Sequence, residues 1–282
     1  MIFEHEIPSG SKLYFGESAK IKREIEFVCA EMLDNIGFEE IVTPIFSYHQ
    51  EDAFEDKKPL LKLNDESNHQ ITLRADSTAD VVRIVTKRLG RSSESKKWFY
   101  IQPTLTFPTN EQYKIGAEII DGNFEEVAKT AIMLLKEIEV EPIMQISNIK
   151  IPHILNEKYG VSLDILKSMS IEKIMKLDLA WIEKLVYMSS CADLDDLSIF
   201  PIEIKNELEK IKEATQKIAY KNIVVSPLFY AKMRYYDSLT FRMFEDNHLL
   251  AMGGIYKIDD VNASGFGLYT DECICSKMNK LS

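Results

Sequence analysis

Alternating side-chain types are clearest between residues 96 and 122. Aromatic and β-branched residues alternate there in two runs, separated by a turn-forming Pro-Thr-Asn segment at 108–110, which predicts two strands joined by a short loop. Lys114 and Glu118 then lie on one face of the second strand, with Gly116 between them. A glycine in that position leaves room for a group to approach the backbone. A solvent-exposed strand face explains the same pattern, so both interpretations stay open.

Apolar residues recur at helical spacing before and after this hairpin, which predicts amphipathic helices. We expect helices at 18–36, 77–89 and 123–138, and strands at 38–42, 70–74 and 142–148. Ser18 and Asn123 are the predicted N-terminal caps of the first and third helices, and Gly37 the end of the first. The polar segment 46–69 predicts a loop with a little strand.

From residue 150 to 221 the pattern changes to helices, with two expected at 170–188 and 201–220. Strands return at 223, with a hairpin turn at 246–247 and a return strand at 249–254. The sequence therefore predicts an α+β fold: a core of residues 1–149 and 222–282, built on an antiparallel sheet flanked by helices, with a helical insertion at 150–221.

Composition excludes several classes of protein. The 282 residues carry a net charge of -11, which disfavours a polyanionic partner such as nucleic acid. No apolar run approaches the ~20 residues of a membrane span, and the first residues lack the features of a signal peptide. The four cysteines predict free thiols in a cytoplasmic protein. The five scattered histidines predict no metal site, and we expect no cofactor.

The hairpin resembles motif 2 of the class II aminoacyl-tRNA synthetases in its histidyl version. The resemblance rests on WFYIQPTLT, from Trp98, and KIGAEIIDG, from Lys114. The family places an arginine that grips the α-phosphate of ATP where this chain has about Thr106, and a glutamine where it has Lys114. The preceding helix, strand and proline resemble motif 1, which implies a homodimer through about residues 17–45. An ordinary surface helix and core strand would give the same periodicity.

Three other segments carry the resemblance further. LRADSTADVVR, from Leu73, is similar to the histidyl segment whose glutamate binds the α-amino group of histidine, and Asp76 stands at that position. Simple helix capping is the alternative role for Asp76. FYAKMRYYDSLTFRMF, from Phe229, places Tyr235 and Tyr236 where paired tyrosines line the histidine pocket, while the catalytic arginine falls near Ala231.

In two further segments, an arginine of the family motif is also replaced. MGGIYKID, from Met252, resembles a Gly-Gly-Arg-Tyr-Asp motif with Ile255 in place of the arginine. ASGFGLYTDECI, from Ala263, resembles motif 3, but the arginine that stacks on adenine falls at Glu272. ATP activation needs fixed cations on the phosphates, so we expect no ligase activity and no catalytic residues. We also expect no anticodon-binding domain.

Together these features resemble the ATP phosphoribosyltransferase regulatory subunits. The resemblance implies a non-catalytic partner of a short-form catalytic subunit in the first step of histidine biosynthesis, through which histidine inhibits the enzyme. It implies an amino-acid pocket, for L-histidine, formed by Asp76, Lys114, Glu118, Tyr235 and Tyr236. A Lys114–Glu118 ion pair along the strand would argue against that pocket. The alternative function is a dimeric synthetase-like scaffold that binds no amino acid and acts through protein contacts.

Overall fold

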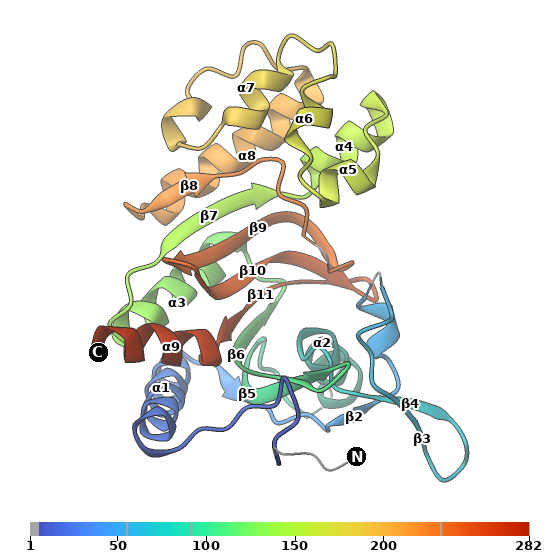
Figure 1. The fold of residues 1–282 in the computed structure, drawn as a ribbon, viewed down its shortest axis with the longest axis vertical. Coiled ribbons are helices and arrows are strands. Elements are labelled where there is room, and N and C mark those ends of the chain that lie inside the picture. The colour runs from blue at the N-terminus through green and yellow to red at the C-terminus, as the bar shows by residue number, and fades with distance from the viewer. Residues whose placement is uncertain (1–5, 55, 91, 232, 282) are drawn as a thin grey trace.

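An eight-stranded sheet forms the centre of the computed structural model, which describes residues 6–54, 56–90, 92–231 and 233–281 (Figure 1). The strand order is β1-β5-β6-β11-β10-β9-β7-β8, and only the β1–β5 and β7–β8 pairs are parallel. The strands are β1 (Glu39–Glu40), β5 (Lys97–Thr106), β6 (Asn110–Ile120), β7 (Ile143–Asn148), β8 (Ile223–Val225), β9 (Tyr236–Glu245), β10 (His248–Ile258) and β11 (Val261–Tyr269). The predicted α+β class is confirmed, and β10 extends beyond the predicted return strand at both ends.

The predicted hairpin is present as β5 and β6. Lys114, Gly116 and Glu118 share one face of β6, and Tyr100 lies directly opposite Gly116. A Cβ atom at Gly116 would come 2.1 Å from the Tyr100 ring. The space that the glycine leaves is therefore filled by Tyr100, and not by a ligand as its position suggested.

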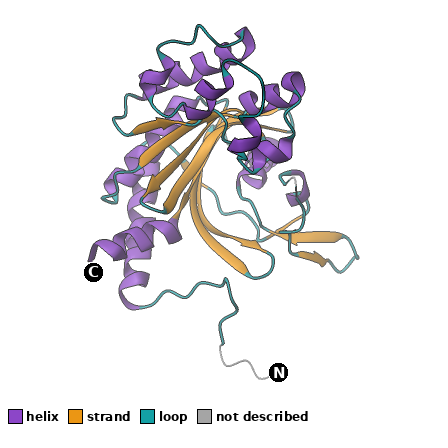
Figure 2. Ribbon diagram, turned by 45° about the horizontal axis from the view of Figure 1, so that its top comes forward, coloured by secondary structure: helices purple, strands orange, loops and turns teal. Residues whose placement is uncertain are grey.

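Helices cover both faces of the sheet (Figure 2). Buried side chains of one face, among them Ile115 and Ala117 of β6, pack under α1, α3 and α9 in the main hydrophobic core. The opposite face carries Tyr100 and Glu118 and is covered by α2. These helices are α1 (Gly16–Asn35), α2 (Thr78–Ile84), α3 (Phe124–Glu137) and α9 (Thr270–Leu281).

The capping residues in the sequence predicted the ends of α1 and α3 to within about two residues. Asn123 accepts a hydrogen bond from the Glu126 amide at 2.9 Å, so the predicted cap of α3 is confirmed. Helix α1 begins two residues earlier than predicted, because Ser18 lies in its first turn and its hydroxyl bonds to the backbone of Phe15. Gly37, with φ +85°, follows the end of α1 as predicted.

The polar segment before α2 forms a small three-stranded sheet with the order β2-β4-β3. Its strands are β2 (Phe46–Ser47), β3 (Lys62–Asn64) and β4 (Gln70–Leu73), and a 3₁₀ turn, η1 (Gln50–Asp52), lies between the first two in sequence. Helix α2 continues as a π-helical turn, η2 (Val85–Leu89), up to the predicted end of the helix. This small sheet projects from the main body in Figure 1.

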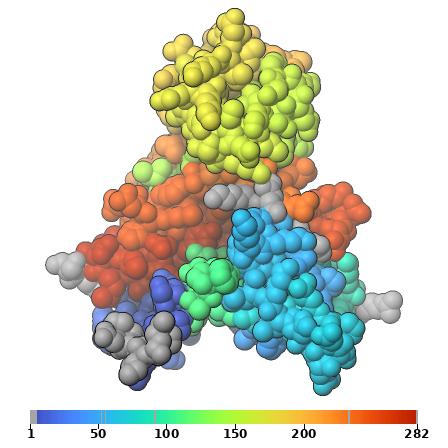
Figure 3. Space-filling model, turned by 45° about the vertical axis from the view of Figure 1, so that its right-hand side comes forward, coloured from blue at the N-terminus to red at the C-terminus, as the bar shows by residue number. Residues whose placement is uncertain are grey.

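Helices gather beside β7 and β8 in the segment predicted to be helical, and Figure 3 shows them as a lobe. They are α4 (Lys150–Tyr159), α5 (Leu163–Lys167), α6 (Ile171–Ile174), α7 (Ile182–Tyr187), η3 (Cys191–Leu194) and α8 (Ile202–Ile218). The single helix expected at 170–188 is wrong, since turns separate α6 from α7. Trp181, between them, packs edge-on against Tyr159 and Phe200, so tertiary packing overrides helical spacing there.

The described ranges lack two other features. No helix among them is long and apolar enough to cross a membrane. Nor does any group of three His, Cys, Asp or Glu side chains among them form a cluster that could hold a metal ion. All four cysteines, Cys29, Cys191, Cys273 and Cys275, are free thiols, as predicted.

Candidate functional site

A cavity of about 90 Å³ lies on the sheet face that α2 covers. Strands β6, β9, β10 and β11 supply most of its walls, and β5, the segment entering α2 and the segment before β9 supply the rest. The lining residues are Asp76, Thr78, Tyr100, Lys114, Met233, Tyr235, Tyr236, Met252, Tyr256, Gly265, Phe266, Gly267 and Tyr269. Four of the five pocket residues expected from the sequence are among them; Glu118 is not.

Asp76 lies at the start of α2 and in the cavity wall. Its Oδ1 accepts a hydrogen bond from the Ala79 amide at 3.1 Å, which caps the start of α2. Its Oδ2 accepts one from the Tyr235 hydroxyl at 3.3 Å inside the cavity wall. Burial raises the pKa of the Asp76 carboxyl, against the opposing effects of Lys114 and of these hydrogen bonds.

Gln50 holds the Asp76 loop in place from behind, and sequence reasoning missed it. This fully buried side chain accepts hydrogen bonds from the amides of Ala75 and Asp76, at 2.9 and 2.7 Å. Its amide nitrogen donates to the Asp76 carbonyl and to Asp80. No local pattern marks such a residue, because its partners lie some 25 positions away in the chain.

Lys114 brings a positive charge to the cavity from β6. Its ammonium lies 5.2 Å from the centre of the Tyr269 ring. Burial lowers the pKa of Lys114, while the nearby charge of Asp76 acts in the opposite direction. Among the described residues, no hydrogen bond or ion pair engages this ammonium, so it can bind an anionic group of a ligand.

Glu118 lies behind the cavity wall. Its carboxylate accepts hydrogen bonds from the hydroxyls of Thr78, Tyr100 and Tyr256, at 2.8, 3.2 and 2.5 Å, and it is fully buried. Burial raises the pKa of Glu118 to about 8, although these hydrogen bonds oppose the shift. The alternative Lys114–Glu118 ion pair is not formed, and Glu118 positions the side chains that line the cavity.

Three tyrosine rings form the aromatic side of the cavity. The ring centre of Tyr235 lies 5.1 Å from that of Tyr236 and 5.3 Å from that of Tyr256. Burial raises the pKa of all three hydroxyls, so they stay neutral hydrogen-bonding groups. Tyr256 was missed, although it directly follows Ile255 in the segment that resembles the Gly-Gly-Arg-Tyr-Asp motif.

One carboxylate and one ammonium thus face a small space beside aromatic rings. Among the described lining residues Lys114 is the single cation. This arrangement suits a small zwitterion with an aromatic or apolar side chain. It offers little to a triphosphate, which needs several fixed cations.

Comparisons with known proteins identify the family of this chain. The family model for histidyl-tRNA synthetase matches residues 15–273. An ATP phosphoribosyltransferase regulatory subunit from Wolinella succinogenes is 46% identical, over 97% of this chain and 96% of its own. A second, from Helicobacter hepaticus, is 39% identical over 97% and 98%. The chain belongs to the ATP phosphoribosyltransferase regulatory subunit family.

The fold of this regulatory-subunit family member also matches a solved structure. A protein from Bacillus halodurans, described as an ATP phosphoribosyltransferase regulatory subunit/histidyl-tRNA synthetase, superposes with a TM-score of 0.85 at 20% identity. The match covers 98% of this chain and 84% of that one. The expected class II synthetase-like architecture is therefore confirmed.

The regulatory-subunit fold places the positions of the expected missing arginines at separate points. Ala231 is buried against Ile149 and Tyr230, two residues before the cavity-lining Met233. Glu272, in α9, bonds to His248 at 2.8 Å. Thr106 ends β5. None of the three lines the cavity described above.

Proposed function

We propose that this chain is a non-catalytic regulatory subunit of ATP phosphoribosyltransferase, the first enzyme of histidine biosynthesis, and that a separate short-form catalytic subunit requires it. The observation that carries this proposal is the 46% identity to a regulatory subunit over nearly the full length of both chains. Co-expression tests it directly. The tagged chain should retain the short-form catalytic subunit through gel filtration, and separate elution of the two would contradict the proposal.

The replaced arginine positions support the non-catalytic assignment. Attack of a carboxylate on ATP develops negative charge on the phosphates, and each missing stabilising group typically costs ~10²–10³ in rate. The motif resemblance places Thr106, Ala231 and Glu272 where the synthetases carry arginines, and Glu272 has the opposite charge. We expect no ATP–pyrophosphate exchange with histidine. ATP–pyrophosphate exchange faster than in a control without the chain would contradict this assignment.

We further propose that the cavity senses L-histidine. The α-ammonium group of the ligand pairs with Asp76 and its carboxylate with Lys114, because these two charges face the cavity and make no ion pair with each other. The imidazole ring then contacts the rings of Tyr235 and Tyr236. Histidine binding there and substrate binding in the catalytic subunit are coupled through a free energy that acts equally in both directions.

A homodimer through residues 17–45 completes the proposal. Exposed large apolar side chains in this range are Phe27, Ile36, Val42 and Ile45, and Val42 is 75% exposed. Such residues favour a surface that a second copy buries. The four free thiols fit a reducing cytoplasm, and the net charge of -11 argues against a nucleic-acid partner.

The size of the cavity favours a second candidate, a dimeric scaffold without an amino-acid ligand. Its volume of about 90 Å³ lies below the ~300–1,000 Å³ of typical small-molecule sites. Calorimetric titration with histidine separates the two functions. Saturable heat supports the sensor, and no heat at millimolar histidine supports the scaffold.

A further inference from the structure

A second cavity, of about 350 Å³, lies on the other side of Tyr235. Tyr235 lines both cavities, so its ring forms a shared wall. The second cavity is lined by Ala53, Ala79, Arg83, Arg234, Tyr235, Lys257, Ile258 and Asp259. Among these described lining residues three are cations and one is a carboxylate. This local excess of positive charge contrasts with the net charge of -11 of the chain.

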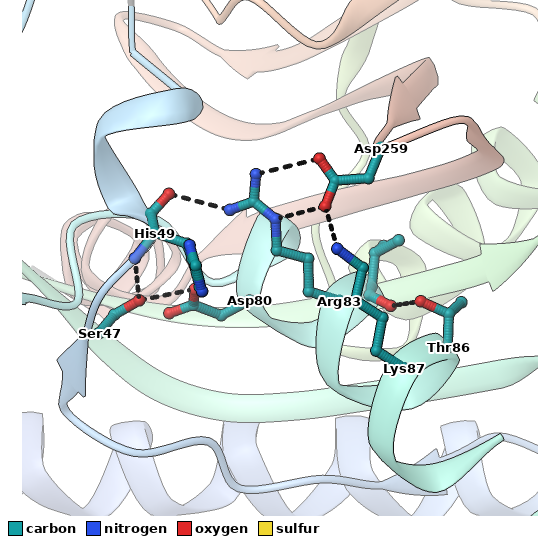
Figure 4. Close-up of polar contacts among 8 residues, drawn as sticks. Ser47, His49, Asp80, Arg83, Thr86, Lys87 and Asp259 are labelled. Atoms are coloured by element: carbon teal, nitrogen blue, oxygen red, sulfur yellow. Dashed lines mark hydrogen bonds and ion pairs between the residues drawn. The ribbon is translucent and has the colours of Figure 1, made fainter. Parts of the chain in front are cut away.

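One wall of the second cavity is held rigidly, as Figure 4 shows. Arg83 donates from Nε to Asp259 at 3.0 Å and from Nη1 to the His49 carbonyl at 2.9 Å, and its side chain is only 11% exposed. Lys87 donates to the same Asp259 carboxylate at 2.6 Å. These two hydrogen-bonded cations lower the pKa of Asp259 to about 2. The one carboxylate among the described lining residues is therefore already neutralised.

The turn between β10 and β11 fixes Asp259 in this position. Asp259 and Asp260 have φ values of 47° and 69°, and Ile258 pairs with Val261 across them. Two consecutive left-handed residues define a tight hairpin turn. The anchored turn and Arg83 together give the cavity a preformed edge.

Arg234 and Lys257 are the other two cations among the described lining residues. Among the described residues, no carboxylate forms an ion pair with Arg234. Lys257 pairs at 3.0 Å with Asp260, but the Asp260 side chain is 95% exposed, so the pair is weak. Their backbone is ordered, because the Lys257 amide donates to the Tyr235 carbonyl at 2.9 Å and Met233 forms a bridge with Phe54.

We propose that this second cavity binds the phosphate group of a small phosphate monoester. The Arg234 guanidinium and the Lys257 ammonium bind the phosphate oxygens, since a guanidinium fork matches two oxygens and the ammonium adds a point charge. The Arg83–Asp259 pair forms the edge against which the phosphate lies. Nothing in this assignment depends on histidine binding in the first cavity.

The volume favours an ester over the free ion. About 350 Å³ lies within the range of small-molecule sites and exceeds the needs of a single phosphate group. Ala53, Ala79, Ile258 and the Tyr235 ring supply the apolar part of the lining. They contact the carbon skeleton of the ester while the cations hold its phosphate.

Isothermal titration with glycerol 3-phosphate, in a chloride buffer of fixed ionic strength, tests the proposal. The wild-type protein should bind saturably, and glycerol without phosphate should give no heat. Arg234→Gln should weaken binding ~10-fold or more, because a hydrogen bond to a charged group contributes ~1.5–3 kcal/mol. Lys257→Gln should act in the same direction. Lys176→Gln is the matched control: it removes one exposed positive charge in the helical lobe and should leave binding unchanged.

The other outcomes count against the proposal. Absence of saturable binding at millimolar glycerol 3-phosphate overturns it. Equal affinities for Arg234→Gln and Lys176→Gln overturn it as well, because binding would then follow net charge alone or lie elsewhere. Binding of inorganic phosphate without binding of glycerol 3-phosphate contradicts the proposal that the ligand is a phosphate monoester. Arg234 is exposed, so its substitution leaves the core intact.

Discussion

Asp76 and Lys114 face one cavity with opposite charges, and no ion pair joins them. Asp76 instead accepts hydrogen bonds from the Ala79 amide and the Tyr235 hydroxyl. Burying two charges without direct pairing is costly. A ligand that brings one ammonium and one carboxylate would recover that cost, which is why this pair is central to the proposed sensing of an amino acid.

Asp76→Asn should abolish most of the affinity for histidine. Asparagine caps helices as well as aspartate does, so α2 should keep its start. The lost charge-assisted hydrogen bond should weaken binding ~10-fold or more, measured by isothermal titration. Asp121→Asn, at an exposed aspartate that pairs with Lys96, is the control and should bind as the wild type does. Unchanged affinity in Asp76→Asn would remove Asp76 from the site.

Two glycines of β11 give a matched test of packing beneath the cavity. A Cβ at Gly265 would come 1.7 Å from Glu118 Oε2 and 2.7 Å from the Ala117 carbonyl oxygen. At Gly267 the nearest atom would be Lys114 Cδ, at an ordinary 3.9 Å. Gly265→Ala should lower the free energy of unfolding by ~1–3 kcal/mol, and Gly267→Ala by much less. Chemical denaturation measures both, and equal losses would contradict the described packing.

The raised pKa of Glu118 has a consequence for stability. The folded protein holds a proton on Glu118 up to about pH 8, whereas the unfolded chain releases it near pH 4.5. This difference in proton binding stabilises the folded protein by on the order of a few kcal/mol. The stabilisation is complete below pH 4.5 and is lost as the pH rises toward 8.

Glu118→Gln should therefore flatten the fall in stability between about pH 5 and pH 8, measured as thermal unfolding against pH. Glu137→Gln, at an exposed glutamate, is the control and should follow the wild-type profile. A profile for Glu118→Gln that matches the wild type would show that Glu118 does not titrate in this range.

Much of the fold follows from local sequence patterns. The β5–β6 hairpin and the Asn123 cap depend on nearest-neighbour chemistry, and both were predicted. The break between α6 and α7 was not, because it depends on Trp181 packing against Phe200 and Tyr159. Contacts between distant segments leave no periodic signal in a single sequence.

The residues of the candidate site also fall into those that the sequence predicted and those that it could not. Asp76 and the paired tyrosines were placed by resemblance to a motif. The positions of Gln50 and Glu118 behind the wall depend on hydrogen bonds between separate elements. Alternation along β6 correctly put Lys114 and Glu118 on one face, but it could not show that Glu118 packs against Gly265 and bonds to Tyr256.

The proposed homodimer predicts that charge at exposed apolar positions of residues 17–45 separates the subunits. Phe27 and Val42 are 66% and 75% exposed in the single chain. Phe27→Glu and Val42→Glu should each convert dimer to monomer in sedimentation velocity, since each loses ~1.5–3 kcal/mol of burial on both sides of a two-fold interface. Ile202→Glu, at a position 66% exposed in α8, should stay dimeric. A monomeric wild type would contradict the interface.

Reconstitution of the complete enzyme tests whether this chain activates the catalytic subunit and makes it sensitive to histidine. The chain is mixed with a short-form ATP phosphoribosyltransferase catalytic subunit, and the condensation of ATP with phosphoribosyl pyrophosphate is followed with and without histidine. We predict activity that depends on the chain and that histidine inhibits, and retained activity without inhibition when the chain carries Asp76→Asn. Equal activity of the catalytic subunit alone, or equal inhibition with wild-type and Asp76→Asn chains, would contradict the account.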